Sequence, residues 1–259
     1  MWIRQIEKNI LECESSLHTL NFLWQENNIY IMDNHLAAGW CWLDCLSQDK
    51  EYNFFHVDQH QDLCCGLATQ DDLERIRNSY PFDIDIYCNF TFERGIATPT
   101  SPFNKVFTWN TYIKQLQYMF PHWFTECYFA CPDYVHDNPQ TTRLPLNIVY
   151  NATNLQIYNN ISYWLSEKNE RKWIFNLDFD YFFDNEGMQI YSDEYIKAFS
   201  QDLYKALENI AVLTIAMSPE CCGNWENSIH ILRIFSDIFH FENVIERFNE
   251  ILEKKYPTP

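Results

Sequence analysis

The residues most capable of chemistry lie in one short segment, in which Asp58, His60 and Asp62 alternate with two glutamines. A mostly apolar run from Phe54 to Val57, typical of a buried strand, precedes them. Because alternate residues of an extended chain point to the same side, the three side chains could converge where this strand ends. Carboxylates and imidazoles are common metal ligands. The segment therefore predicts one part of a metal site.

A second acidic pair follows another apolar run far along the chain. Trp173 to Leu177 has the composition of a strand buried on both faces, and Asp178 and Asp180 come directly after it. Two strands that each end in alternate carboxylates predict a metal site above a parallel sheet. We interpret the protein as a metallohydrolase organised around this site.

Two more apolar runs end in polar residues of the same kinds. His35 follows the run 28–32, and Glu220 follows the run 211–217. Ligands of open α/β sheets bind beyond the carboxyl ends of the strands, so four such strand ends favour one common site. Taken singly, each motif could instead be a solvated turn.

Two further polar residues lie within the expected strands. His56 shares a strand face with Asp58, and Asn176 shares one with Asp178. His56 could orient a metal ligand through a hydrogen bond or be a satisfied core histidine. Asn176 could support the site or simply pack in the core.

The elements that must position these residues alternate between strands and helices. Apolar runs predict strands at 28–32, 52–57, 105–109, 127–130, 173–177 and 211–217. Helical spacing predicts helices at 1–27, 36–46, 193–209 after an N-cap at Ser192, and 225–255 with a break near His240. This alternation predicts an α/β protein. We expect one domain over residues 1–259, with three α/β/α layers around a mainly parallel sheet.

The composition excludes several classes of function. The chain has 36 acidic and 18 basic residues, and its net charge of −18 opposes binding to nucleic acid. The same charge favours cationic partners or substrates, although it could serve solubility alone. The chain has five glycines and contains neither GxGxxG nor GxxxxGKS/T, which excludes nucleotide binding through those motifs.

The sequence also predicts a cellular location. No apolar run approaches the ~20 residues that cross a bilayer, and the first residues do not resemble a secretory signal. The ten cysteines lack zinc-finger spacing. We therefore expect a cytoplasmic protein with reduced thiols and no membrane partner.

The strand-end motifs resemble the arginase/deacetylase (ureohydrolase-like) superfamily, whose binuclear metal centre uses a histidine after one strand, then DxHxD, then DxD. His35, the segment 58–62 and the pair Asp178 and Asp180 occur in the same order. The strings HVDQHQD, NLDFDYFF and SPE look most similar to a branch that contains the peptide arginases of ribosomal natural-product biosynthesis. Members of that branch convert arginine in a precursor peptide to ornithine. The resemblance implies an arginase/deacetylase-like fold.

The resemblance also implies which residues would hold two Mn²⁺ ions. One ion would be bound by His35, Asp58, Asp62 and Asp178. The other would be bound by His60, Asp180 and the bridging Asp58 and Asp178. Oxygen-rich ligands with two imidazoles suit Mn²⁺, although other divalent metals are possible. A hydroxide bridging both ions would attack the guanidinium carbon of arginine and release urea and ornithine.

The residues for substrate binding and proton transfer follow less directly from the resemblance. The arginase loop whose histidine transfers protons has no counterpart, and His56 or His136 could take its place. Glu220 could pair with the guanidinium, whose planar donors a carboxylate matches in bidentate fashion. Further candidates for the pocket wall are Asp33, Asn89 and Glu93.

We therefore expect a peptide arginase, a binuclear metallohydrolase acting on linear amidines, whose partner is an arginine-containing precursor peptide. The alternatives are a metal-dependent amidohydrolase or deacetylase on the same fold, and a non-catalytic metal-containing binding protein.

Overall fold

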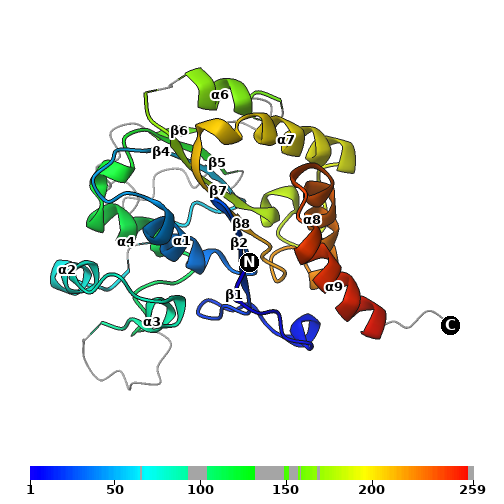
Figure 1. Cartoon of the computed structure of the whole chain (residues 1–259), viewed down its shortest axis with the longest axis horizontal. Helices are drawn as coiled ribbons and strands as arrows, with labels where there is room; N and C mark the ends of the chain where they lie inside the picture. The colour runs from blue at the N-terminus through cyan, green and yellow to red at the C-terminus, as the bar shows by residue number, and fades with distance from the viewer. Residues whose placement is uncertain are drawn as a thin grey trace.

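The computed structural model describes residues 1–64, 66–92, 104–131, 149–151, 157, 159–167 and 170–255. Within these residues, eight strands form one sheet in the order β1-β2-β3-β8-β7-β4-β5-β6 (Figure 1). The strands are β1 (Trp2–Arg4), β2 (Leu23–Glu26), β3 (Ile29–Met32), β4 (Asn53–Val57), β5 (Cys127–Ala130), β6 (Val149–Asn151), β7 (Trp173–Asp178) and β8 (Ile210–Ala216). Neighbours from β3 to β6 are parallel, whereas β1 and β2 pair antiparallel at one edge. The predicted mainly parallel sheet is confirmed.

Helices cover both faces of this sheet. The α-helices are α1 (Ala38–Cys45), α2 (Gln70–Asn78), α3 (Ile84–Asn89), α4 (Tyr112–Met119), α6 (Ile161–Glu167), α7 (Asp193–Lys205), α8 (Trp225–Phe239) and α9 (Glu242–Lys255). Helices α6, α7, α8 and α9 pack in one buried cluster with strand residues such as Phe55 and Phe175. Helices α1, α2, α3 and α4 pack in a second cluster with Phe54 and Ile174. Because consecutive strand residues point to opposite faces, β4 and β7 supply both cores. The three-layer α/β/α architecture is confirmed.

Two predicted features of the C-terminal helices are present. The Ser192 side chain accepts a hydrogen bond from the backbone N–H of Tyr195 and so caps α7. Between α8 and α9, His240 adopts a left-handed conformation with φ of 64°, which ends the first helix. The predicted N-cap and the predicted break are both confirmed.

The helix expected over residues 1–27 is wrong. This segment instead holds β1, the short 3-10 helix η1 (Ile10–Glu12) and β2, which pairs antiparallel with β3. The two residues Asn27 and Asn28 connect β2 to β3, and Asn27 has a φ of 53°. Asparagine tolerates this left-handed conformation and favours two-residue hairpins. The Asn-Asn pair outweighs the helical spacing of the apolar residues before it.

The strand expected at 105–109 is also wrong. Lys105 forms only an isolated bridge with Thr91, and the chain then turns into α4. The hydroxyl of Thr111 receives a hydrogen bond from the N–H of Thr108 and donates one to the Val106 carbonyl. These local bonds occupy backbone groups that a strand would pair with a neighbour.

Among the helices in the described ranges, none is both long enough and apolar enough to cross a lipid bilayer.

Candidate metal centre

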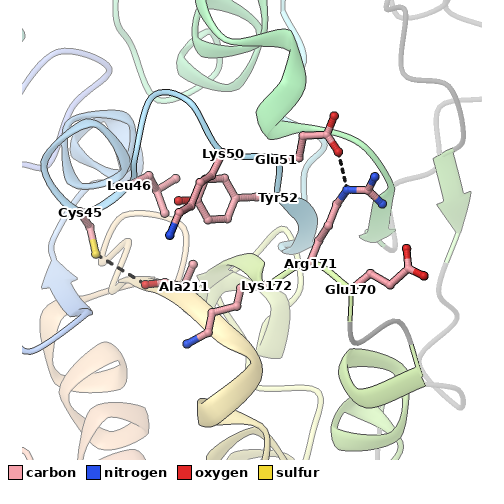
Figure 2. Close-up of a pocket in the computed structure, with 9 residues that line it drawn as sticks. All are labelled: Cys45, Leu46, Lys50, Glu51, Tyr52, Glu170, Arg171, Lys172 and Ala211. Carbon is pink, nitrogen blue, oxygen red and sulfur yellow. Dashed lines mark hydrogen bonds and ion pairs between the residues drawn. The ribbon is translucent and has the colours of Figure 1, made fainter.

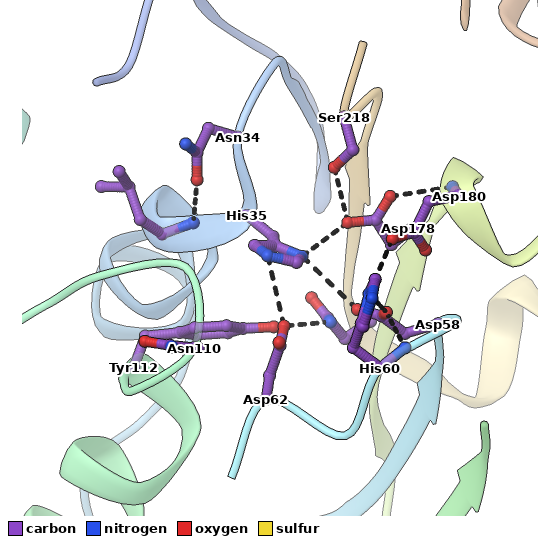
Figure 3. Close-up of polar contacts among 12 residues, drawn as sticks. Asn34, His35, Asp58, His60, Asp62, Asn110, Tyr112, Asp178, Asp180 and Ser218 are labelled. Carbon is purple, nitrogen blue, oxygen red and sulfur yellow. Dashed lines mark hydrogen bonds and ion pairs between the residues drawn. The ribbon is translucent and has the colours of Figure 1, made fainter. Parts of the chain in front are cut away.

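The carboxyl ends of the parallel strands β3, β4 and β7 bring the six predicted metal ligands together (Figure 3). Asp58 directly follows β4, Asp178 is the last residue of β7, and His35 begins the 3-10 helix η2 (His35–Ala37) after β3. The carboxyl-edge cluster, as we name it, comprises His35, Asp58, His60, Asp62, Asp178 and Asp180.

His35 is central to one half of this cluster. Its Nδ1 lies 2.6 Å from Asp178 Oδ2 and 3.5 Å from Asp58 Oδ2. Its Nε2 lies 3.2 Å from Asp62 Oδ2. One buried imidazole therefore meets three carboxylates from two separate segments. These four residues are the set that the resemblance implies for one ion.

His60 is central to the other half. Its Nδ1 lies 3.0 Å from Asp180 Oδ2 and 3.6 Å from Asp58 Oδ1. The His60 side chain is 45% exposed, whereas Asp58 and Asp180 are buried. Asp58 therefore belongs to both halves, and the second half is the one open to solvent.

Backbone and hydroxyl donors fix the carboxylates of the cluster. The N–H of His60 donates to Asp58 Oδ1 over 2.6 Å, and the N–H of Asp180 donates to Asp178 Oδ1 over 3.0 Å. The Ser218 hydroxyl donates to Asp178 Oδ2 over 2.6 Å. These bonds hold both aspartates in one orientation, with Oδ2 of Asp58 left for another partner.

Two residues of the site have an unusual backbone. Asp62 has a φ of 52° and Ser218 has a φ of 40°. Non-glycine residues rarely adopt this left-handed region, and such strain is concentrated at functional sites. Here it turns the Asp62 carboxylate and the Ser218 hydroxyl towards the cluster (Figure 3).

The donor set of the cluster fits a divalent cation. Its four carboxylates are buried, and Oδ2 of Asp58 and Oδ2 of Asp62 have no hydrogen-bond partner among the described residues. A buried carboxylate oxygen without a partner is costly unless a cation or a donor compensates it. Carboxylate oxygens with two imidazoles are suitable ligands for Mn²⁺ and similar ions.

The electrostatics of the carboxylates point in the same direction. Burial raises the pKa of Asp62 well above its usual value, and the repulsion from Asp58 and Asp178 adds to it against the attraction of His35. Burial, with Asp178 and Asp58 close by, also raises the pKa of Asp180 well above its usual value. A bound cation would relieve this repulsion.

The histidines respond to the same carboxylates. Burial alone would lower the pKa of His35, but Asp62 and Asp178 outweigh it and raise that pKa well above the usual value. Hydrogen bonds to Asp180 and Asp58 raise the pKa of His60 to about 11. Protonated His35 and His60 offset part of the charge of these carboxylates.

His56 lies beneath the cluster and is fully buried. Its Nε2 is 3.4 Å from Asp58 Oδ2 and 3.1 Å from the backbone carbonyl of His60. It also forms a possible ligand group with Asp58 and Asp62. Burial lowers the pKa of His56, which favours the neutral imidazole. Its predicted catalytic role stays a prediction.

Two other predicted site residues contact the N-terminal segment. The carboxylate of Asp33 accepts hydrogen bonds from the N–H groups of Asn21 and Phe22 and is buried there. Glu220 follows β8, is exposed as a residue, and accepts a hydrogen bond from the N–H of Ser15. Their predicted substrate contacts stay predictions.

Asn89 lies at the end of α3, where it is exposed and hydrogen bonds to the Asp85 carbonyl and the Lys105 ammonium. Glu93 and His136, also proposed from the sequence, lie outside the described residues.

The structure adds two residues that the sequence analysis did not assign to the site. Ser218 follows β8 just as Asp178 ends the adjacent β7, so the alignment of neighbouring strand ends could have identified it. Tyr112 begins α4, and its ring stacks on the His35 ring with centroids 5.5 Å apart. The position of Tyr112 depends on how α4 packs, and no local sequence signal indicates it.

The chain was compared with family models, curated proteins and solved structures. No family model matches the chain, and no curated protein matches it. Among solved structures, the fold is similar to that of Entamoeba histolytica arginase in complex with L-ornithine, with a TM-score of 0.44 and 12% sequence identity. The match covers 80% of this chain and 68% of the arginase chain. A similarity this distant carries no functional argument, so the site must be assigned from its own geometry.

Proposed function

We propose that this protein is a metal-dependent hydrolase whose carboxyl-edge cluster binds two divalent cations, with Mn²⁺ as the best match to the ligands. The observation that carries the proposal is the position of Asp58. It is shared by the His35 half and the His60 half, and its buried Oδ2 has no hydrogen-bond partner among the described residues. A carboxylate placed between two imidazole-containing groups is suited to bridging two ions.

The residues that would hold each ion follow from the two halves. The first ion would be bound by His35, Asp58, Asp62 and Asp178. The second would be bound by His60, Asp180, Asp58 and Asp178. When bound, such a pair of ions would lower the pKa of a water molecule and polarise a substrate C–N centre. The chain contributes fixed carboxylates, a buried floor and one solvent-facing side at His60.

We propose an arginine side chain of a precursor peptide as the substrate. Addition of water to the guanidinium carbon and cleavage of its bond to Nε would give urea and an ornithine residue, with a proton required on the departing amine. The net charge of −18 would attract a cationic guanidinium, and the motif resemblance supports the same substrate. Glu220, exposed after β8, would pair with the guanidinium.

The test is incubation of Mn²⁺-loaded protein with an arginine-containing peptide, with urea measured by a coupled assay and the peptide by mass spectrometry. Equal amounts of urea and ornithine are expected. The matched control is Asp178→Asn, which keeps the shape of the side chain and removes its charge. Release of an acyl group from an acylated peptide without urea would favour a deacetylase. Peptide binding without any turnover would favour a non-catalytic protein and contradict the proposed hydrolase, whereas acyl release would contradict the proposed arginine substrate.

A further inference from the structure

A line of buried polar groups crosses the sheet beneath the carboxyl-edge cluster. The indole N–H of Trp42 lies 3.3 Å from the Thr214 hydroxyl oxygen, which lies 2.7 Å from Asn176 Oδ1. The Asn176 amide nitrogen then lies 2.9 Å from His56 Nδ1 and 2.8 Å from the Tyr112 hydroxyl. All five side chains are buried. Strand register produces this line, because His56 pairs with Asn176 and Asn176 pairs with Thr214 on adjacent strands.

One end of this line fixes the direction of its hydrogen bonds. An indole N–H can only donate, so the Thr214 oxygen accepts from Trp42. The single Thr214 hydroxyl proton is then available for Asn176 Oδ1, which is the shorter of its two acceptor contacts. The amide oxygen of Asn176 therefore faces Thr214, and its NH₂ group faces the opposite way.

The other end fixes the same direction independently. A backbone carbonyl can only accept, so the proton on His56 must lie on Nε2, where it is donated to the His60 carbonyl. In the neutral imidazole, Nδ1 is then an acceptor and requires a donor. The NH₂ group of Asn176 supplies it. Both ends thus require one orientation of the same amide.

This orientation uses both N–H bonds of Asn176, one for His56 and one for Tyr112. The Tyr112 oxygen is an acceptor in that contact, so its own proton points elsewhere. Tyr112 stacks on His35, and its hydroxyl end lies near the Asp62 carboxylate (Figure 3). One amide therefore determines the hydrogen bonding of two groups that touch opposite parts of the cluster.

We propose that Asn176 is a positioning residue of the metal centre. It is not one of the six ligands. Through His56 it holds the carbonyl of His60 and hence the 58–62 segment. Through Tyr112 it holds the ring that stacks on His35. Both ring nitrogens of His56 are occupied in this arrangement, so His56 orients the ligand segment and does not bind the ion itself. The inference rests on the proposed metal site.

The decisive variant is Asn176→Asp, which keeps the size of the side chain but replaces its NH₂ donor with an acceptor. His56 Nδ1 would then need a proton of its own, and the support of the His60 carbonyl would be disturbed. Loss of a residue that orients ligands typically weakens metal binding by about 10–100-fold. We expect a decrease of this size in Mn²⁺ affinity, measured by competition with a chelator. In metal-free protein, ¹⁵N NMR should show His56 protonated at Nε2 in the wild type and at Nδ1 in the variant.

Asn53→Asp is the matched control, because Asn53 is a buried asparagine at the other end of β4. It should lower the thermal midpoint without changing Mn²⁺ affinity. Two milder variants keep the test usable if Asn176→Asp does not fold. Thr214→Val frees the amide to rotate, and Tyr112→Phe removes one of its acceptors, so each should weaken Mn²⁺ binding by a smaller factor than Asn176→Asp.

Unchanged Mn²⁺ affinity in all the folded variants, or a wild-type His56 protonated at Nδ1, would overturn the inference. This failure is distinguishable from failure of the proposed function. Wild-type protein that binds no Mn²⁺ would refute both, whereas wild-type protein that binds Mn²⁺ with insensitive variants would refute the role of Asn176 alone.

Discussion

The two ends of the parallel strands carry opposite kinds of charged site. At the amino ends, a cavity of about 660 Å³ is lined by residues that include Lys50, Glu51, Arg171 and Lys172 (Figure 2). Its clearest ion pair joins Arg171 Nε to Glu51 Oε2 over 2.7 Å, with both side chains partly exposed. At the carboxyl ends, four carboxylates and the imidazole of His35 are buried in the carboxyl-edge cluster.

The difference shows that buried polar atoms without a hydrogen-bond partner indicate a functional site better than cavity volume does. Charges at the amino ends are partly exposed and partly paired, and pairs of this kind contribute little to stability. Charges at the carboxyl ends have lost their water, and Asp58 and Asp62 each keep an oxygen without a donor among the described residues. Of these two sites, the one at the carboxyl ends therefore offers the buried carboxylate oxygens that a cation could bind.

The largest expected effect follows from Asp58→Asn. Because Asp58 is shared by both halves of the cluster, its loss should weaken Mn²⁺ binding by more than the ~100-fold that loss of an outer partner can cause. Hydrolysis should become undetectable. Metal content after dialysis, measured by mass spectrometry, checks the prediction. Retained metal together with retained turnover would contradict the assignment of Asp58.

The thermal stability of the metal-free protein and that of the metal-loaded protein should change with pH in opposite directions. The pKa of His60 is raised to about 11, so its contribution to metal-free stability is complete below the unfolded value of ~6.5 and is lost as the pH rises towards 11. Metal binding requires deprotonated ligands and should therefore strengthen with pH. As the pH rises between these limits, the thermal midpoint should fall without Mn²⁺ and rise with it. His60→Gln should flatten the metal-free slope, and equal slopes in both states would count against the cluster.

For Asp62→Asn we expect two smaller effects of opposite sign, namely a more stable metal-free protein and weaker Mn²⁺ binding. The pKa of Asp62 is raised well above its usual value, so its ionised form destabilises the metal-free fold at neutral pH. Removing that charge should raise the metal-free midpoint, by roughly 2–4 °C for each kcal/mol gained. The same change should weaken Mn²⁺ binding. A variant that loses stability with and without metal would mean that Asp62 is mainly structural.

The smallest effect is expected at the amino ends. Glu51→Gln breaks the ion pair with Arg171, which is partly exposed and screened by solvent. Such pairs contribute about 0.2–1 kcal/mol, so the thermal midpoint should shift little. Mn²⁺ binding and turnover should remain at wild-type levels in calorimetry and urea assays. A loss of metal binding here would end the contrast between the two sites.

The sequence predicts the six clustered residues because they depend on local facts. Each lies at the end of an apolar strand or in the short segment that follows it, and parallel strands present their carboxyl ends at one edge of the sheet. The same reasoning places Glu220 only near that edge, since strand order alone does not orient a side chain beyond the strand.

The features that the sequence analysis missed depend on tertiary contacts. Tyr112 approaches His35 only because α4 packs against the sheet, and α4 itself follows a stretch expected to be a strand. The direction of the amide of Asn176 depends on Thr214 and His56 on neighbouring strands. Strand register can suggest such neighbours, but hydrogen-bond geometry is needed to connect them.

The most direct test of the central claim is anomalous diffraction at the manganese edge from crystals grown with Mn²⁺. We expect two peaks within the carboxyl-edge cluster, one beside His35 and Asp62 and one beside His60 and Asp180, with Asp58 in contact with both. Absence of any peak in the cluster at saturating Mn²⁺, or Mn²⁺ bound only at the amino ends of the strands, would contradict the claim.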